Sequence, residues 1–170
     1  MAEAAVCSDV THIFPRFAKL VRAWAEANGV YKTKFGFVGG IGWAVIVLRF
    51  LLICRDSIVD LIATVPRDNV SNDNNARSDE NSSTTANNNH DNDERLEALF
   101  VRFIDWLDAN VCDRWSEPLA LPGSDEPRGA APPIAVHTPT GVFVARHSTP
   151  ATAHRLSSIV KQTKVSCIRS

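Results

Sequence analysis

The residues of this sequence best suited to chemistry gather at a glycine-rich turn. Gly39 and Gly40 open a long apolar stretch, and Ile41 follows them. The cationic and phenolic side chains shortly before this turn are Arg22, Tyr31, Lys32 and Lys34. Paired glycines let a backbone approach a planar or anionic ligand closely, and the N-terminus of a helix favours negative charge. The grouping therefore indicates a nucleotide site, with basic groups at the phosphates and Ile41 against a base. The alternative is a glycine-lined helix crossing with Tyr31 at the edge of the core.

Other motifs that carry catalysis or bind metals are sparse. The five histidines show no HxxxH or HExxH spacing, and the four cysteines form no CxxC pair. A zinc site is therefore not predicted, and free thiols in a reducing compartment are the simplest interpretation. Asp91 and Asp93 form a DxD pattern with the ligand type that magnesium prefers. Because a metal site needs a rigid element beneath its carboxylates, and this segment offers none, we do not predict one there.

Charge is unevenly distributed along the 170 residues, whose formal net charge is -1. Residues 1–66 carry 7 basic and 5 acidic side chains, residues 67–95 carry 3 and 7, and residues 96–170 carry 8 and 7. The middle segment is rich in Asn and poor in apolar residues, so it cannot offset the entropy of ordering. We expect a disordered acidic insertion at 67–95 within one fold made of 1–66 and 96–163, and a tail at 164–170. The near-neutral total gives no broad basic surface for nucleic acid.

Apolar residues recur with helical spacing on both sides of this insertion. The periodic segments run from Ile13 to Trp24 and from Leu96 to Leu107, and each predicts an amphipathic helix. We expect Thr11 to cap the start of the first helix and Asn28-Gly29 to end it.

The C-terminal third of the sequence has a different pattern. A proline-rich stretch runs to Pro133, and short strands are predicted at 134–136 and 142–145. Ser148 or Thr149, followed by Pro150, is typical of a helix start. The predicted fold class is therefore mainly α with a minor β element (α+β).

Residues 35–54 form an apolar stretch with one charge, Arg49. Twenty such residues are long enough to span a bilayer, and Gly36 and Gly40 make a GxxxG pair. A charge near the membrane centre would cost about 2–3 kcal/mol, however. We therefore favour a buried helix in which Arg49 pairs with a carboxylate, and a membrane anchor is the alternative.

The residues around the glycine turn resemble the central domain of eukaryotic poly(A) polymerases. In that family a helix ends in the sequence lysine-x-tryptophan-alanine. A second motif follows, glycine-phenylalanine-leucine-glycine-glycine-x-x-tryptophan-alanine, with an arginine six residues after its tryptophan. Here the segments that carry the likeness are 21–31, 36–44 and 47–49. Weaker similarities follow at 100–118, 125–128, 133–139 and 148–149, so the resemblance covers about residues 12–163.

The resemblance implies a helical central domain of a nucleotidyltransferase-type polymerase that closes over ATP. Arg22 stands where the family has a lysine at the triphosphate, and Tyr31 where a tyrosine meets the phosphates. Gly40 and Ile41 stand at the backbone and side chain that pack on adenine. Thr138 stands where a threonine approaches the base. These five residues are the predicted ATP-binding residues.

The departures from the family concern catalysis. The family transfers AMP from ATP to the 3′ end of RNA with two Mg²⁺ or Mn²⁺ ions held by three aspartates, after a Gly-Ser turn and a DxD strand. Those residues belong upstream of Met1, so we predict no catalytic or metal-binding residue here, and expect a gene fragment or a truncated paralogue. Gly42 also replaces a serine or alanine. The resemblance implies a nuclear protein; without it we expect a cytoplasmic one. The alternative function is a non-catalytic module that binds a nucleotidyltransferase in trans.

Overall fold

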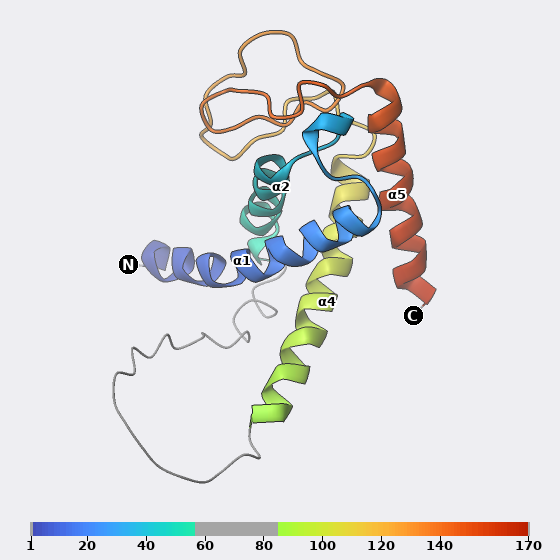
Figure 1. Ribbon diagram of the computed structural model, residues 1–170. Helices are drawn as coiled ribbons and strands as arrows, with labels where there is room; N and C mark the ends of the chain where they lie inside the picture. Colours follow the sequence, from blue (N-terminus) through green and yellow to red (C-terminus); the bar gives the residue numbers. More distant parts are fainter. Residues whose placement is uncertain (1, 57–84, 170) are drawn as a thin grey trace, which may run out of the picture.

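Four α-helices and a cap of irregular loops make up the part of the chain that the computed structural model describes, residues 2–56 and 85–169, with side chains for 10–56 and 93–168. The elements are α1 (Ala2–Ala27), the 3-10 helix η1 (Thr33–Phe35), α2 (Gly40–Ile53), α4 (Thr85–Asn110) and α5 (Pro150–Arg169). In Figure 1, α1 crosses α4, α4 and α5 run side by side in opposite directions, and the loops between them cover one end. The predicted mainly helical class is confirmed.

Helix α1 is longer at its N-terminus than the sequence pattern predicts. It begins at Ala2, so the expectation that Thr11 caps its start is wrong. The residues before Thr11 are rich in Ala, the best helix former, so the helix continues beyond its periodic part. The predicted stop is confirmed, because α1 ends at Ala27 and Gly29 adopts a φ of 67°.

Helix α2 is the buried helix that the sequence favours. Its 14 residues include Val45, Ile46, Val47 and Phe50 in the core. The guanidinium of Arg49 donates to the carbonyl oxygen of Ala120, so the prediction of a carboxylate partner is wrong. A backbone acceptor from the loop cap takes that role because α2 packs beneath it. Within the described ranges, no helix has both the length and the apolarity to cross a membrane.

Helix α4 begins inside the segment that was expected to be disordered. Of the predicted insertion, residues 67–84 lie outside the described residues, whereas α4 starts at Thr85. The expectation of disorder is therefore wrong for residues 85–95. A formed helix gains one hydrogen bond per added residue, so a turn packed at Leu99 and Phe103 can extend outward through polar sequence.

Helix α5 starts where the sequence predicts and ends later. Pro150 is its first residue, and the amide of Thr152 donates to Thr149 Oγ1 over 3.2 Å. The predicted tail at 164–170 instead continues the helix to Arg169. Lys164 holds this part against α4, because its Nζ lies 2.9 Å from Asp108 Oδ2 and 3.3 Å from Asp105 Oδ1.

Three phenylalanines from three helices meet at the centre of the core. Phe17 of α1 meets Phe103 of α4 edge-on, with ring centroids 5.6 Å apart, and Phe50 of α2 lies 5.3 Å from Phe103. All three are almost fully buried. Edge-to-face pairs of this kind add about 0.5–1.5 kcal/mol to the burial of the rings.

The loop cap holds the minor β element. The predicted strands at 134–136 and 142–145 appear as isolated bridges, Leu119 to Val136 and His137 to Phe143. The cap rests on the start of α2, where a Cβ on Gly42 would lie 2.9 Å from Val144 Cγ2. The same Cβ would lie 2.5 Å from Val38 Cγ1, so close packing on two sides explains why glycine stands at position 42.

Candidate functional site

A hollow of about 220 Å³ lies where α1 crosses the start of α2. Its walls come from α1, from the loop that follows α1 and from the first turn and a half of α2. The lining residues are Pro15, Ala18, Lys19, Arg22, Tyr31, Gly40, Trp43 and Ala44. Three of the five predicted ATP-binding residues, Arg22, Tyr31 and Gly40, therefore share one hollow although they are up to eighteen positions apart.

Arg22 supplies a cation at the edge of this hollow. Its Nε donates to Glu26 Oε1 over 3.0 Å, and its Cζ lies 5.3 Å from the centroid of the Tyr31 ring. The hydrogen bond and the negative charge of Glu26 raise the pKa of Arg22 further above its ordinary value. The exposed guanidinium is thus oriented by Glu26 and Tyr31 and stays charged, which suits an anionic ligand.

The contact between Tyr31 and Gly40 fixes the inner wall. A Cβ added to Gly40 would lie 2.9 Å from the Tyr31 hydroxyl oxygen, closer than side-chain carbons normally come. Tyr31 also pairs with Val38 in a β-bridge, which folds the intervening loop back on itself. The following residue, Lys32, has a φ of 84°, a conformation that is costly for a residue with a side chain.

The N-terminus of α2 faces this region without a capping side chain. Gly39 is the N-cap residue. It has no side chain to accept a hydrogen bond from the first amides of the helix. The next residue after Gly40, Ile41, is 66% exposed. Free amides at a helix start and an exposed apolar side chain beside them form a surface that can take a phosphate and an apolar group.

Thr138 lies outside this hollow. Its Oγ1 accepts a hydrogen bond from the amide of Val142 over 3.2 Å and lies 3.0 Å from Thr140 Oγ1. These contacts hold the turn of the loop cap. The structure therefore brings Arg22, Tyr31 and Gly40 together, leaves Ile41 exposed beside them, and gives Thr138 a turn-forming role.

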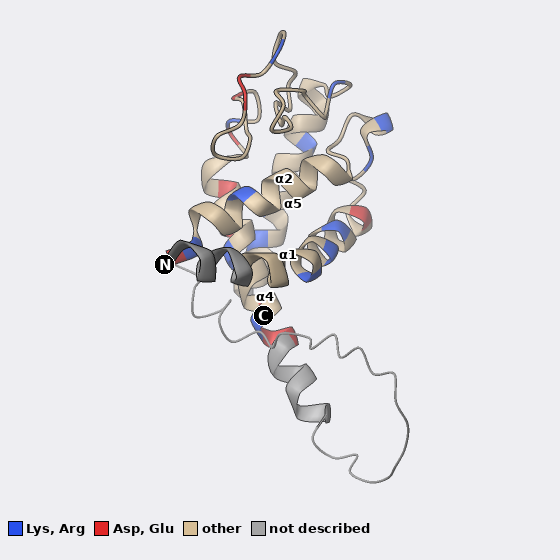
Figure 2. Cartoon of the chain, turned by 90° about the vertical axis from the view of Figure 1, so that its left-hand side faces the viewer, with Lys and Arg blue, Asp and Glu red and all other residues tan. Residues whose placement is uncertain are grey.

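Lys19 and Trp43 line the hollow without having been predicted. Lys19 precedes Arg22 by three positions, so helical spacing places both on one face of α1, and this signal was present in the sequence. Figure 2 shows the basic residues of α1 and of the loop after it on one side of the chain. Trp43 is 2% exposed, and within the described side chains its indole N–H has no hydrogen-bond partner.

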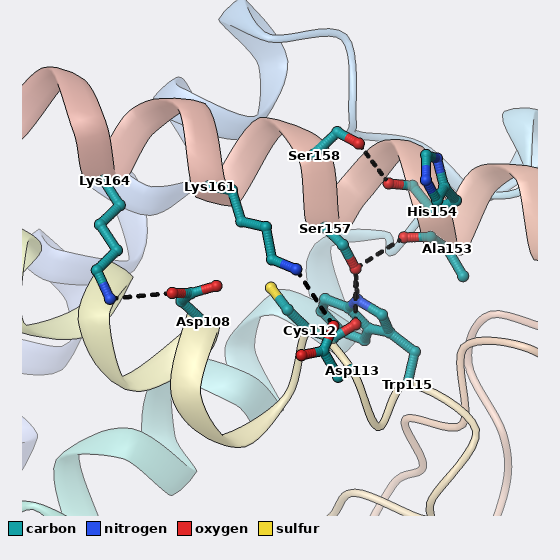
Figure 3. A network of polar contacts seen from close by, with 10 residues as sticks. All are labelled: Asp108, Cys112, Asp113, Trp115, Ala153, His154, Ser157, Ser158, Lys161 and Lys164. Atoms are coloured by element: carbon teal, nitrogen blue, oxygen red, sulfur yellow. Dashed lines mark hydrogen bonds and ion pairs between the residues drawn. The ribbon is translucent and has the colours of Figure 1, made fainter.

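A larger hollow of about 640 Å³ lies between the end of α4, the proline-rich loop and the first half of α5. Figure 3 shows a network of polar contacts that includes several of its lining residues. Ser157 accepts from the indole N–H of Trp115 over 2.9 Å, and Lys161 Nζ lies 3.3 Å from Asp113 Oδ1. Burial raises the pKa of the Cys112 thiol to about 12, with a smaller contribution from Asp108. The serine and the thiol are therefore engaged or unreactive, and the hollow offers no activated nucleophile.

Metal-ligand clusters are absent from the described residues, where no three His, Cys, Asp or Glu side chains stand close enough to hold an ion. Asp91 lies in α4, and its side chain is outside the described ones. Comparison of the chain with known protein families, with curated proteins and with solved structures finds no match.

Proposed function

We propose that this chain is an ATP-binding domain of the poly(A) polymerase type, the helical domain that would close over ATP during AMP transfer to an RNA 3′ end. The observation that carries the proposal is the shared hollow of Arg22, Tyr31 and Gly40. The resemblance assigns these three residues to one nucleotide. Residues that bind one nucleotide must lie close together in space, and these residues line the same hollow.

The chemistry of the hollow supports a nucleotide over other small anions. Arg22 and Lys19 provide positive charge, and the amides at the start of α2 provide donors for phosphate oxygens. Ile41 provides an exposed apolar surface within one residue of those amides. A ligand with both a phosphate chain and an aromatic base uses all of these groups, whereas inorganic phosphate uses only the cations and the amides.

Isothermal titration of ATP into the purified chain tests this proposal. We expect ATP to bind more tightly than inorganic triphosphate, because the base adds an apolar contact. Arg22→Ala is expected to weaken ATP binding about tenfold, the effect of losing one charge-assisted hydrogen bond. Lys161→Ala serves as the matched control, because Lys161 lies in the other hollow. Equal affinities for wild type and Arg22→Ala would contradict the proposal.

The proposal assigns no AMP transfer to this chain alone, because the residues that would hold the two metal ions have no counterpart in its sequence. A primer-extension assay with ATP and Mg²⁺ or Mn²⁺ is expected to give no tailing of an RNA oligonucleotide. Tailing that survives combined Asp91→Ala and Asp93→Ala substitution would contradict this assignment.

The second candidate function is a non-catalytic module that binds a nucleotidyltransferase domain in trans. The observation in its favour is that two large apolar side chains of this region are exposed, Phe35 at 59% and Ile41 at 66%. A pulldown with a recombinant nucleotidyltransferase domain that Phe35→Asp abolishes would favour it. A monomeric chain that binds ATP alone and ignores that domain would count against it.

A further inference from the structure

The loop cap contains a hollow that is separate from the one between α1 and α2. Its volume is about 350 Å³, and its lining residues are Arg128, Ala130, Pro132, Gly141, Val142, Phe143 and Arg146. The lining holds two cations, no carboxylate and otherwise apolar groups. It therefore suits a ligand that carries an anionic group on an apolar body.

The walls of this hollow are held in place by the loop segments behind them. The amide of Arg128 donates to the carbonyl oxygen of Gly141 over 3.0 Å. Gly141 has a φ of 74°, and a Cβ there would overlap the carbonyl group of Glu126. The Phe143 ring is 6% exposed and meets the His137 ring edge-on, with centroids 5.9 Å apart. Because these walls are already formed, binding costs less entropy than it would in a loose loop.

Both arginines of the hollow can donate hydrogen bonds to an anion. The Nε of Arg146 donates to the carbonyl oxygen of Phe143 over 3.2 Å, which orients the side chain and leaves its terminal nitrogens as further donors. Neither Arg128 nor Arg146 forms an ion pair with a described carboxylate. A guanidinium group presents parallel N–H donors that match the two oxygens of a carboxylate.

The charges around the hollow favour a ligand with a single negative charge. The segment that carries Arg128 also carries Asp125 and Glu126, both exposed. Charges two or three positions apart lie within about one Debye length of each other, so these carboxylates offset the charge of the two arginines. A polyanion therefore gains little attraction from net charge here, whereas a carboxylate is held by directed hydrogen bonds.

We propose that this hollow binds a small monocarboxylic acid whose apolar body is about the size of one ring. The carboxylate lies between Arg128 and Arg146, and the body lies against the apolar wall. Val142 is 38% exposed, so this wall offers accessible apolar surface. The hollow shares no lining residue with the one between α1 and α2, so the inference does not depend on the proposed function.

Titration of phenylacetate into the isotope-labelled full chain, followed by amide chemical shifts, tests the inference. We expect the largest shifts at residues 141–143, and a Kd on the order of 1 mM, which is what a ligand of few atoms reaches. Acetate lacks the ring and 2-phenylethanol lacks the charge, so each should bind at least about tenfold more weakly. Phenyl phosphate, a dianion, is expected to bind no more tightly than phenylacetate.

Variants of the two arginines test which groups hold the carboxylate. Arg128→Gln combined with Arg146→Gln is expected to raise the Kd for phenylacetate at least about tenfold. Arg146→Lys should raise it less, because lysine keeps the charge and loses only the forked donor. Arg155→Gln changes an exposed arginine of α5 and is the matched control, with an unchanged Kd.

A further variant keeps the inference testable if the double arginine variant does not fold. Ala130→Glu places a repelling carboxylate on an exposed lining residue and is expected to weaken phenylacetate binding similarly. Thermal melting of each variant shows whether its fold is retained. Three outcomes would overturn the inference: shifts at 141–143 no larger than elsewhere, an unchanged Kd in the folded variants, or binding of 2-phenylethanol or phenyl phosphate that is tighter than that of phenylacetate.

Discussion

The indole N–H of Trp115 donates to Ser157 Oγ over 2.9 Å, and the same hydroxyl donates to the carbonyl oxygen of Cys112 over 2.7 Å. One buried hydroxyl thus joins α5 to the residues that follow α4. Both partners are enclosed, since Trp115 is 5% and Cys112 4% exposed. Without the hydroxyl, a buried donor and a buried acceptor would lose their partner together.

Ser157→Ala is therefore expected to lower the free energy of unfolding by about 1–3 kcal/mol, the range for leaving buried polar groups unsatisfied. The neighbouring Ser158 offers a matched control, because its hydroxyl donates within α5, to the carbonyl oxygen of His154 over 3.0 Å. Ser158→Ala should change the free energy by less than about 0.5 kcal/mol. Urea denaturation followed by circular dichroism measures both free energies of unfolding. Equal decreases would show that the hydrogen bond with Trp115 does not stabilise the fold more than the bond within α5 does.

The helical part of this fold could be predicted because burial there follows a period. Ile13, Phe17 and Val21 recur with helical spacing, and each is buried in α1. The start of α4 could not be predicted in this way, because residues 85–95 are polar and the helix extends through them from a packed turn. The hydrogen-bond partner of Arg49 could not be predicted from the sequence either. A carbonyl acceptor 71 positions away leaves no compositional signal.

The contact between Gly40 and the Tyr31 hydroxyl predicts an energetic coupling between the two positions. Gly40→Ala adds helix propensity worth up to about 1 kcal/mol, but its Cβ would push against the hydroxyl oxygen. We expect Gly40→Ala to destabilise the chain with Tyr31 and to be neutral or stabilising with Tyr31→Phe. The coupling energy should be at least about 0.5 kcal/mol, the lower end for residues in contact. Urea melts of the four combinations measure it, and strictly additive effects would refute the contact.

The residues of the candidate site that follow from the order of a sequence motif could be predicted. The residues whose role depends on tertiary packing could not be predicted. Arg22, Tyr31 and Gly40 were assigned from their order in the motif, and they line one hollow. Thr138 was assigned in the same way, yet its side chain holds a turn. Turn hydrogen bonds depend on the local path of a proline-rich loop, which periodicity does not describe.

The raised pKa of Cys112 predicts how stability changes in alkaline solution. The folded thiol has a pKa of about 12 against an ordinary 9.0, mainly because burial disfavours the thiolate. The unfolded chain therefore loses this proton first, so the stabilising effect is complete below about pH 9 and is lost as pH rises towards 12. We expect the free energy of unfolding to fall more steeply with pH in the wild type than in Cys112→Ala. Parallel slopes between pH 8 and 10.5 would contradict the assignment.

The last prediction concerns Lys19, which lines the same hollow as Arg22, Tyr31 and Gly40 but belongs to no motif identified in the sequence. It lies one helical turn before Arg22, so a triphosphate held by Arg22 would also come within reach of its ammonium group. Lys19→Ala is expected to weaken ATP binding about three- to tenfold at low salt, and less at high salt, where exposed charges are screened. Lys34→Ala is the control in the neighbouring loop, since Lys34 Nζ lies over the Phe35 ring at 4.8 Å and lines no part of the hollow. If both substitutions weakened ATP binding equally, the affinity would depend only on the overall positive charge of this side of the molecule and not on the hollow.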